Sequence, residues 1–435
     1  MESIKLKYGK STVDISTDGA KSVKTLIENP MREIEDIEKE FRFCITDGVI
    51  GGKQLKELVS ADDKITVIIS DMTRFWMHQD VICKLLVEYM HDELNIPFKN
   101  IAVLIALGTH RKNSEDEKKI LSSEYVYKNV ELVVDHDCDA DDLVNVGTTS
   151  FGTDVFVNPL VMDRKVIVIS GTVHHIMAGY GGGRKSIIPG VASRETVKMN
   201  HSRALDPDEP KSSKLIGSGR LIENPINEDM EEAGKMVDPV FGINICVNSA
   251  SKHSAFFCGE FDKAWKESCL YIQKSYGLPI DYEADVVFVS CGGFPKDLNF
   301  YQSTKSMFNG VKAVKPGGTL VLFAQCSEGS GARDFFDWIK PLQEGHLDES
   351  LRKDFTIGGY IFYAACEAMR KGNILLLSSL SPDEVKDMGV DSYQDIDELM
   401  KHVDVKDKSV YIIPYGGSVM PQLKEVYDKL ISELA

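Results

Sequence analysis

Runs of Val, Ile and Leu recur along the chain and alternate with longer segments whose apolar residues follow helical spacing. This alternation is typical of βαβ units, in which helices cover a mostly parallel sheet. The sequence therefore predicts an α/β fold. In the first half, the predicted strands are 64–70, 100–107, 130–134 and 165–170, and the predicted helices are 79–92 and 113–122. In the last third, the predicted strands are 285–290, 319–323, 373–377 and 409–413, and the predicted helices are 303–314 and 361–370.

The two series of strands indicate two α/β domains, because 435 residues exceed what one hydrophobic core usually organises. The second series begins after a helical stretch, so we predict domains at 1–278 and 279–435, with the active site in the cleft between them. Residues 4–15 alternate around a Tyr-Gly turn and predict a peripheral antiparallel hairpin. The closing helix, 421–434, can pack on either domain.

Polar residues follow three of the predicted strands directly. Ligands of parallel sheets bind beyond the carboxyl ends of the strands, so these residues are candidates for a site. A single histidine in such a place is more often an ordinary surface residue, but three polar segments at one sheet edge can form a site together. The segments are Asp71-Met72-Thr73-Arg74, Gly108-Thr109-His110-Arg111 and Gly171-Thr172-Val173-His174-His175.

A glycine-rich segment at residues 179–186 combines four glycines with Arg184 and Lys185. Glycine lets backbone N–H groups approach a phosphate, and a following basic side chain neutralises its charge. A flexible hinge is the alternative interpretation. Both common nucleotide motifs fail here, because the P-loop and the nicotinamide fingerprint each require a glycine where Arg184 stands.

Two further positions carry candidate chemistry. His201 comes sixteen residues after Lys185, at the end of a stretch with helical character. In the second domain, Tyr301, Gln302 and Lys305 lie about one helical turn apart, beyond the first strand of that series. The plainer interpretations are a surface histidine and a solvated helix start.

Charge and cysteine content exclude several classes of protein. Fifty Lys and Arg against 67 Asp and Glu give a net charge of −17, which disfavours binding to nucleic acid or to an anionic membrane surface. The nine cysteines contain no C-x-x-C pair, and no run approaches the ~20 apolar residues of a membrane span. We therefore expect a cytoplasmic enzyme in a reducing compartment, with a small anionic substrate still allowed by a few focused basic residues.

Taken in order, the motifs resemble those of the nickel-dependent lactate racemase family, whose members racemise or epimerise small 2-hydroxy acids. The resemblance spans nearly the whole chain. It rests on Asp71-x-Thr73-Arg74, Gly108-Thr109-His110-Arg111, the block from His175 through Arg184-Lys185 to Pro189-Gly190, Thr196 with Asn200-His201, residues 219–232, and Tyr301-Gln302-x-x-Lys305.

The resemblance implies a cofactor of nickel held by pyridinium-3-thioamide-5-thiocarboxylic acid mononucleotide, a nickel-pincer nucleotide. Lys185 corresponds to the lysine that carries this group, and His201 to the histidine that binds nickel. Partners implied are a small anionic 2-hydroxy acid and the enzymes that make the cofactor. The other residues implied to contact the cofactor are Asp71, Thr73, Gly181, Gly182, Gly183, Arg184 and Tyr301.

The resemblance also assigns the chemistry of the substrate. His110 and His175 match the acid/base pair, which would exchange protons with the hydroxyl while hydride passes to the cofactor ring and returns to the opposite face. His174 stands beside the second base, but His175 alone lies ten residues before Lys185, as the family pattern requires. The residues that match the substrate-holding groups are Arg74, Gln302 and Lys305.

One departure concerns the substrate, and two other functions remain open. Members that act on lactate usually have prolines soon after the Thr-Arg pair, whereas Phe75 and Trp76 follow here and would reshape the pocket. An ATP-dependent kinase or ligase with an atypical phosphate loop at 179–186 would need ATP and Mg²⁺. A non-catalytic hydroxy-acid sensor would bind ligand without turnover.

Overall fold

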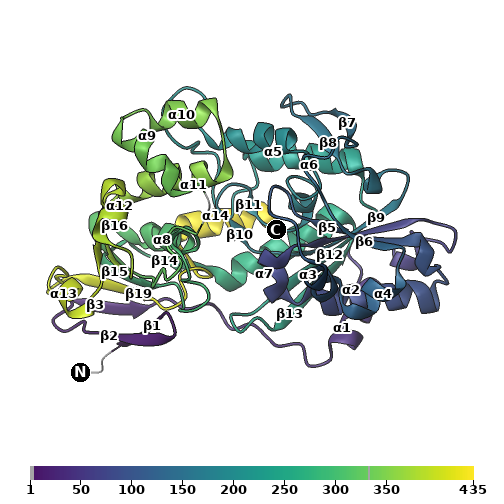
Figure 1. The fold of residues 1–435 in the computed structure, drawn as a ribbon. Coiled ribbons are helices and arrows are strands. Elements are labelled where there is room, and N and C mark those ends of the chain that lie inside the picture. Colours follow the sequence, from purple (N-terminus) through teal and green to yellow (C-terminus); the bar gives the residue numbers. More distant parts are fainter. Residues whose placement is uncertain (1–3, 332–333) are drawn as a thin grey trace. The chain divides into compact units, whose positions relative to one another are not determined.

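The protein is described by a computed structural model that covers residues 4–331 and 334–435. The chain divides into two compact units, each built on its own six-stranded sheet (Figure 1). The larger unit comprises Pro30–Ala204, Ser213–Gln273 and Leu430–Ala435. The smaller unit comprises the segment ending at Asn29, together with Leu205–Ser212 and Lys274–Lys429.

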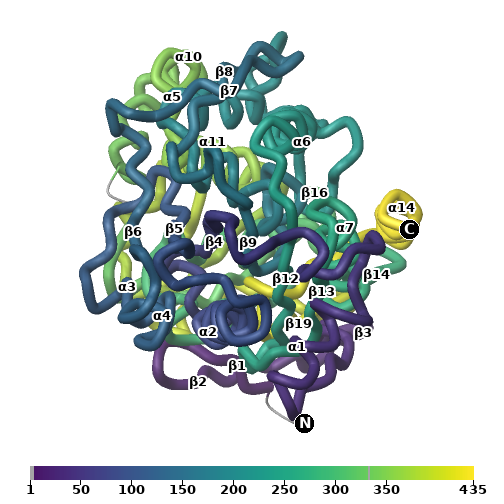
Figure 2. The backbone as a smooth tube through the Cα atoms, turned by 90° about the vertical axis from the view of Figure 1, so that its right-hand side faces the viewer, coloured from purple at the N-terminus to yellow at the C-terminus, as the bar shows by residue number. Residues whose placement is uncertain are grey.

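The sheet of the larger unit has the strand order β13-β12-β9-β4-β5-β6. All neighbours are parallel except β12 and β13, which are antiparallel. Figure 2 shows β6, β5, β4 and β9 following one another across this unit. The strands are β4 (Ile65–Ser70), β5 (Ile101–Ala106), β6 (Leu132–Asp135), β9 (Lys165–Gly171), β12 (Phe241–Val247) and β13 (His253–Gly259).

The strands β4 and β5 form because most of their residues are β-branched or leucine and become buried on both faces. The segments that surround the sheet include two short hairpins and a π-helical turn that ends α2. The hairpins are β7 (Val144–Thr148) with β8 (Asp154–Val157), and β10 (His174–His175) with β11 (Gly179–Tyr180). The helices are α1 (Ile37–Ile45), α2 (Gln79–Glu88), η3 (Tyr89–Glu93), α3 (Glu115–Ser122), α4 (Glu124–Asn129), α5 (Arg194–His201), α6 (Pro225–Val237) and α7 (Phe261–Tyr276).

The sheet of the smaller unit has the order β18-β17-β16-β15-β19-β3 and is parallel throughout. Its strands are β3 (Ser22–Thr25), β15 (Ala284–Ser290), β16 (Val314–Phe323), β17 (Asn373–Leu377), β18 (Val390–Tyr393) and β19 (Ser409–Ile413). Two further pairs are β1 (Ile4–Tyr8) with β2 (Ser11–Ile15), and β14 (Gly277–Ile280) with β20 (Met420–Leu423). The helices are α8 (Phe300–Ala313), α9 (Ile339–Gln343), α10 (Leu347–Lys353), α11 (Ile357–Met369), α12 (Pro382–Val385), α13 (Ile396–Met400) and α14 (Lys424–Leu434).

The predicted α/β fold with two mostly parallel sheets is confirmed. The units differ from the predicted contiguous domains, 1–278 and 279–435, since residues 4–29 lie in the smaller unit. The physical reason is that Leu6 and Ile15 are buried in the core of that unit, and β3 pairs with β19. The closing helix α14 is divided between the units after Lys429.

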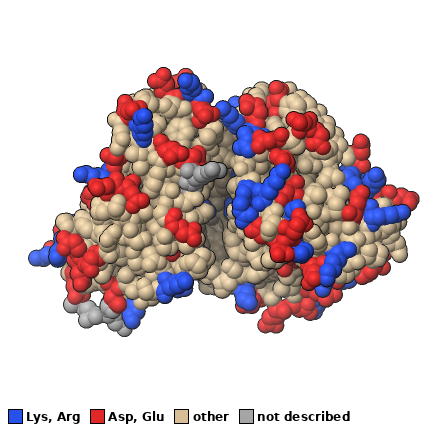
Figure 3. Space-filling model, in the orientation of Figure 1, with Lys and Arg blue, Asp and Glu red and all other residues tan. Residues whose placement is uncertain are grey.

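Charged side chains of both signs are spread over the surface. On the face that Figure 3 shows, Asp and Glu lie among Lys and Arg over both units. In the part of the chain that the structure describes, no helix is long and apolar enough to cross a membrane.

Candidate functional site

The first two polar segments meet at the carboxyl ends of β4 and β5 because these strands are paired, with Ser70 opposite Ala106. Asp71 caps the 3-10 helix η2 (Met72–Met77), and its Oδ1 accepts hydrogen bonds from the N–H and the hydroxyl of Thr73. Its Oδ2 lies 2.6 Å from Nδ1 of His110. One carboxylate thus joins the loops that follow two neighbouring strands.

The contact between Asp71 and His110 determines which nitrogen of the imidazole can react. A carboxylate only accepts, so Nδ1 of His110 donates to it and Nε2 keeps its lone pair. Burial acts to raise the pKa of Asp71, but hydrogen bonds from His110 and Thr73 and the charge of Arg74 hold it below its ordinary value. The His110 side chain is 57% exposed while that of Asp71 is 8% exposed, so a buried carboxylate orients an accessible imidazole.

The glycine-rich segment is packed against the protein itself. Gly183 has φ +48°, and a Cβ atom there would come within 2.4 Å of the Trp265 ring. Arg184 is 1% exposed, forms ion pairs with Glu231 and Asp262 at 2.6 and 2.8 Å, and lies over the Trp265 ring. The positive charge of Arg184 is therefore compensated within the protein, which favours an anchoring role for this side chain.

Lys185 lies next to the anchored Arg184 and interacts with two other predicted site residues. Desolvation and the charge of Arg74 lower the pKa of Lys185 to about 7. Lys185 in turn acts on His201, whose pKa is lowered first by burial and then by the charge of that lysine. Arg74, Lys185 and His201 therefore interact electrostatically, and Arg74 also interacts with Asp71.

His201 ends α5 and is almost completely buried. Its Nδ1 lies 3.2 Å from the carbonyl oxygen of Val197, which can only accept, so Nδ1 carries the proton and Nε2 keeps its lone pair. A histidine held in this way through one nitrogen is prepared to bind a metal through the other. Among the described residues, no group of three or more His, Cys, Asp and Glu is arranged to hold a metal ion.

His174 and His175 form β10, so their side chains point to opposite faces of the short hairpin. Nε2 of His174 lies 2.9 Å from Oε1 of Gln273, and its ring packs at 5.1 Å from the Tyr180 ring. Nδ1 of His175 accepts the backbone N–H groups of Met177 and Ala178. In this arrangement Nε2 of a neutral His175 carries the proton.

The other predicted residues belong to the smaller unit. Gln302 lies in the first turn of α8, where Oδ1 of Asn299 accepts its backbone N–H. The ammonium of exposed Lys305 donates to Oε1 of Gln302 at 2.7 Å. The ring of Tyr301 packs against Phe335. The assignment of Tyr301, Gln302 and Lys305 to cofactor or substrate stays a prediction.

Two residues around the site were not predicted. Gln273 contacts His174 and Tyr180, and the fully buried Asp229 binds the side chain of Asn200. Asp229 falls in the segment 219–232 that carries part of the family resemblance, but that segment holds several acidic residues. Only burial distinguishes Asp229 from its neighbours.

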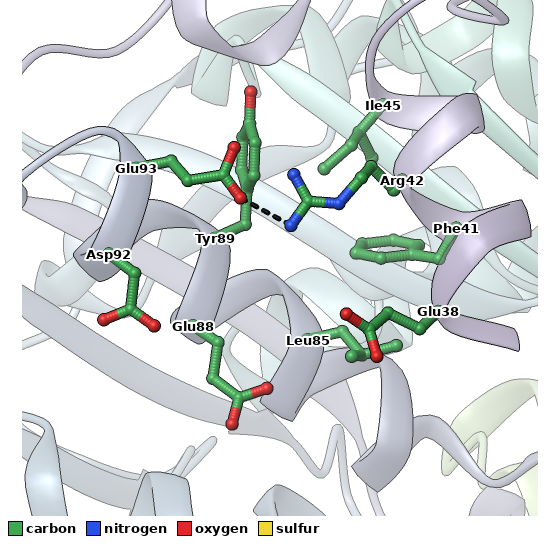
Figure 4. A pocket seen from close by; sticks show the side chains of 9 residues that line it. All are labelled: Glu38, Phe41, Arg42, Ile45, Leu85, Glu88, Tyr89, Asp92 and Glu93. Carbon is green, nitrogen blue, oxygen red and sulfur yellow. Dashed lines mark ion pairs between the residues drawn. The ribbon is translucent and has the colours of Figure 1, made fainter.

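A surface cavity of about 140 Å³ lies between α1 and the end of α2 in the larger unit (Figure 4). Arg42 and Glu93 form an ion pair across it, and Phe41 and Tyr89 contribute aromatic rings. None of the predicted site residues lines this cavity. It is therefore separate from the group formed by Asp71, His110, Lys185 and His201.

Comparison with known proteins extends over nearly the entire chain. The lactate racemase of Thermoanaerobacterium thermosaccharolyticum is 29% identical over 445 residues, covering 98% of this chain and 100% of that protein. The lactate racemase of Lactiplantibacillus plantarum is 26% identical over 436 residues, covering 97% of this chain and 100% of that protein.

Solved structures give the same picture. The lactate racemase apoprotein from T. thermosaccharolyticum matches with a TM-score of 0.84 at 27% identity, covering 97% of this chain and 100% of that chain. A Thermotoga maritima protein shares the fold, with a TM-score of 0.66 at 18% identity over 91% of this chain and 100% of that one. The family model of the lactate racemase N-terminal domain matches residues 8–212, and that of the C-terminal domain matches residues 280–421. The chain therefore belongs to the lactate racemase family, whose two domains it carries in order.

Proposed function

We propose that this chain is a racemase or epimerase that inverts the carbinol carbon of a small 2-hydroxy acid. Its full-length relatives are lactate racemases, which supports racemase chemistry in general. The observation that carries the proposal is the Asp71–His110 pair, in which a buried carboxylate orients an accessible imidazole. This pair interacts through Arg74 with Lys185, and Lys185 interacts with His201.

The residues of this unit fit the nickel-pincer nucleotide that the family resemblance implies. Lys185 would carry the group, since a pKa of about 7 leaves much of its amine neutral and nucleophilic near neutral pH. His201 would bind nickel through Nε2, because its Nδ1 is engaged by Val197. When bound, the nucleotide would supply a hydride acceptor beside the substrate. The remaining chemistry belongs to the side chains of the chain.

His110 would act as the general base. Its Nε2 lone pair accepts the proton of the substrate hydroxyl as the C–H bond breaks, and Asp71 stabilises the imidazolium that forms. The product of this half-reaction is a planar 2-keto acid. A proton returned to the oxygen after hydride reaches the opposite face of the carbon completes the inversion.

His175 would serve the other enantiomer, but it must first change its hydrogen bonds. While Nδ1 accepts from Met177 and Ala178, Nε2 of the neutral ring holds a proton and can only donate a hydrogen bond. To act as a base through Nε2, the neutral ring must release Nδ1 from these two N–H groups, lose the proton from Nε2 and carry a proton on Nδ1 instead. We therefore propose that His110 is ready as a base at rest, whereas His175 requires a local rearrangement.

Arg74 would bind the substrate carboxylate, for which a guanidinium fork is well suited. Beside it in η2, the Trp76 ring is 41% exposed and donates its indole N–H to the carbonyl of Thr73. Together with Phe75, this side chain stands where members that act on lactate usually have prolines. These aromatic residues would reshape the pocket around the side chain of the 2-hydroxy acid.

The function is tested by loading the protein with the nickel-pincer nucleotide and incubating it with enantiopure 2-hydroxy acids. The panel should run from lactate to acids with branched and aromatic side chains, and loss of optical rotation reports turnover. The reaction should proceed without ATP or Mg²⁺. Turnover that requires ATP supports a kinase or ligase instead, and binding without turnover in the loaded protein supports a sensor.

A further inference from the structure

Asp229, in helix α6, is completely buried and binds side chains from two other elements. Its Oδ1 accepts from the hydroxyl of Thr149 at 2.6 Å. Its Oδ2 accepts from the hydroxyl of Thr153 at 2.7 Å, from the amide of Asn200 at 2.9 Å and from Nε of Arg203 at 3.4 Å, which also forms an ion pair with it. One carboxylate therefore joins α6 to the β7–β8 turn and to the end of α5.

The bond to Asn200 fixes the orientation of that side chain. Both amide hydrogens are used, one by Asp229 and the other by the carbonyl oxygen of Ile226 at 3.1 Å. A flipped amide would point its oxygen at two acceptors, so the orientation is determined. Within the described part of the chain, the buried Oδ1 of Asn200 accepts no hydrogen bond. The two hydrogen bonds that its NH₂ group donates therefore hold this side chain in place.

Helix α5 is consequently held at both ends. In its first turn, the hydroxyl of Thr196 donates to the carbonyl of Asp154 at 2.6 Å and accepts the N–H of Phe156 at 3.1 Å. In its last turn, Asn200 is held by Asp229, and His201 is the next residue. The direction in which the His201 ring points depends on both attachments.

We infer that Asp229 is a positioning residue that, through Asn200, fixes the last turn of α5 and so aims Nε2 of His201. This inference rests on the proposed function, in which His201 binds nickel. Metal–ligand distances tolerate only about 0.2 Å of error, and removal of outer partners of metal ligands typically weakens metal binding about 10–100-fold. Asp229 does not itself touch the metal in this scheme.

The test compares Asp229→Ala with Asp229→Asn and Asn200→Ala. An asparagine at position 229 can turn its oxygen toward Asn200, since the Thr149 hydroxyl can rotate to accept from the new amide. Glu232→Ala is the matched control, because Glu232 also lies in α6 and binds the same turn through Ser150 but has no bond to α5. Asn200→Ala removes the link without removing the bonds between Asp229 and the threonines, which protects the test against misfolding of Asp229→Ala.

Two measurements are made. Hydrogen exchange of the peptide 194–204 in the apoprotein should become roughly tenfold faster in Asp229→Ala and Asn200→Ala, and stay near wild type in Asp229→Asn and Glu232→Ala. In loaded protein, Asp229→Ala and Asn200→Ala should keep the covalent adduct on Lys185, as measured by intact mass, but should bind nickel about 10–100-fold more weakly. Unchanged exchange and unchanged nickel retention in both variants would overturn the inference. A different outcome is that the wild-type protein takes up neither the adduct nor nickel while the two variants still show faster exchange of α5. That result would refute the proposed function, but it would support the anchoring of α5 by Asp229.

Discussion

Replacing Asp71 by Asn tests the proposed base directly. The amide oxygen can still accept from Thr73, so the new NH₂ group faces Nδ1 of His110, which is 2.6 Å from the present carboxylate oxygen. An NH₂ group only donates, so Nδ1 must give up its proton and Nε2 must take it. The substitution thus reverses the tautomer of His110 with almost no change in volume.

The size of the effect follows from the bond and its exposure. A hydrogen bond to a charged group contributes about 1.5–3 kcal/mol, and solvent around the half-exposed His110 ring favours the lower end, roughly a ten- to thirtyfold loss in kcat. The reversed tautomer should lower kcat further, because Nε2 of His110 can then no longer accept a proton. The total loss should stay within the ~10²–10⁴-fold that is typical of losing an acid/base group. The loss in kcat of Asp71→Asn should not exceed that of His110→Ala. The double variant, which carries both substitutions, should be no slower than His110→Ala alone.

The assay is the initial rate of racemisation of each enantiomer by loaded protein, with the covalent adduct on Lys185 verified by intact mass. Asp80→Asn provides the matched control, because it makes the same chemical change in α2 at a carboxylate that binds no site residue. The control should retain wild-type rates. If Asp71→Asn, fully loaded, remains within about twofold of wild type for both enantiomers, the Asp71–His110 pair is not the base.

Three further predictions concern the remaining site residues. Lys185→Met should abolish the covalent adduct by intact mass yet stabilise the apoprotein, because the folded-state pKa of about 7 lies below the ordinary value of 10.5. Between these two pH values the unfolded wild-type chain binds more protons than the folded one, so the free energy of unfolding of the wild type should rise with pH. Lys185→Met should therefore have a higher free energy of unfolding than wild type, by up to a few kcal/mol, below pH 7. This difference should vanish above about pH 10, as measured by denaturant titration. Arg74→Lys should raise KM roughly ten- to a hundredfold, since the bidentate fork is lost although the charge remains, and an unchanged KM would exclude Arg74 from carboxylate binding. His175→Ala should abolish racemisation while His174→Ala, which loses contacts to Gln273 and Tyr180 and no proposed base, should remain active; the opposite result would exchange their roles.

Eight strands of the two sheets were predicted, because burial on both faces leaves runs rich in Val, Ile and Leu, as in β4, β5 and β15, whereas β3, β12, β13 and β18 were not. Strand β12 was missed, although all its residues are buried, since Gly242 and Asn244 interrupt its apolar run. The membership of residues 4–29 in the smaller unit was not predicted from sequence. It depends on which sheet edge β3 joins, and a short exposed strand carries no record of its partner.

The sequence by itself determined the family and the fold class and supplied the candidate residues of the site, because these follow from local composition and from the order of short motifs. Tertiary structure alone decided how those residues are prepared for chemistry. The tautomers of His110 and His201 are set by Asp71 and by a helix carbonyl, and the charge of Arg184 is compensated by carboxylates 47 and 78 positions away. Such contacts depend on distance and burial in three dimensions, which amino-acid spacing does not encode.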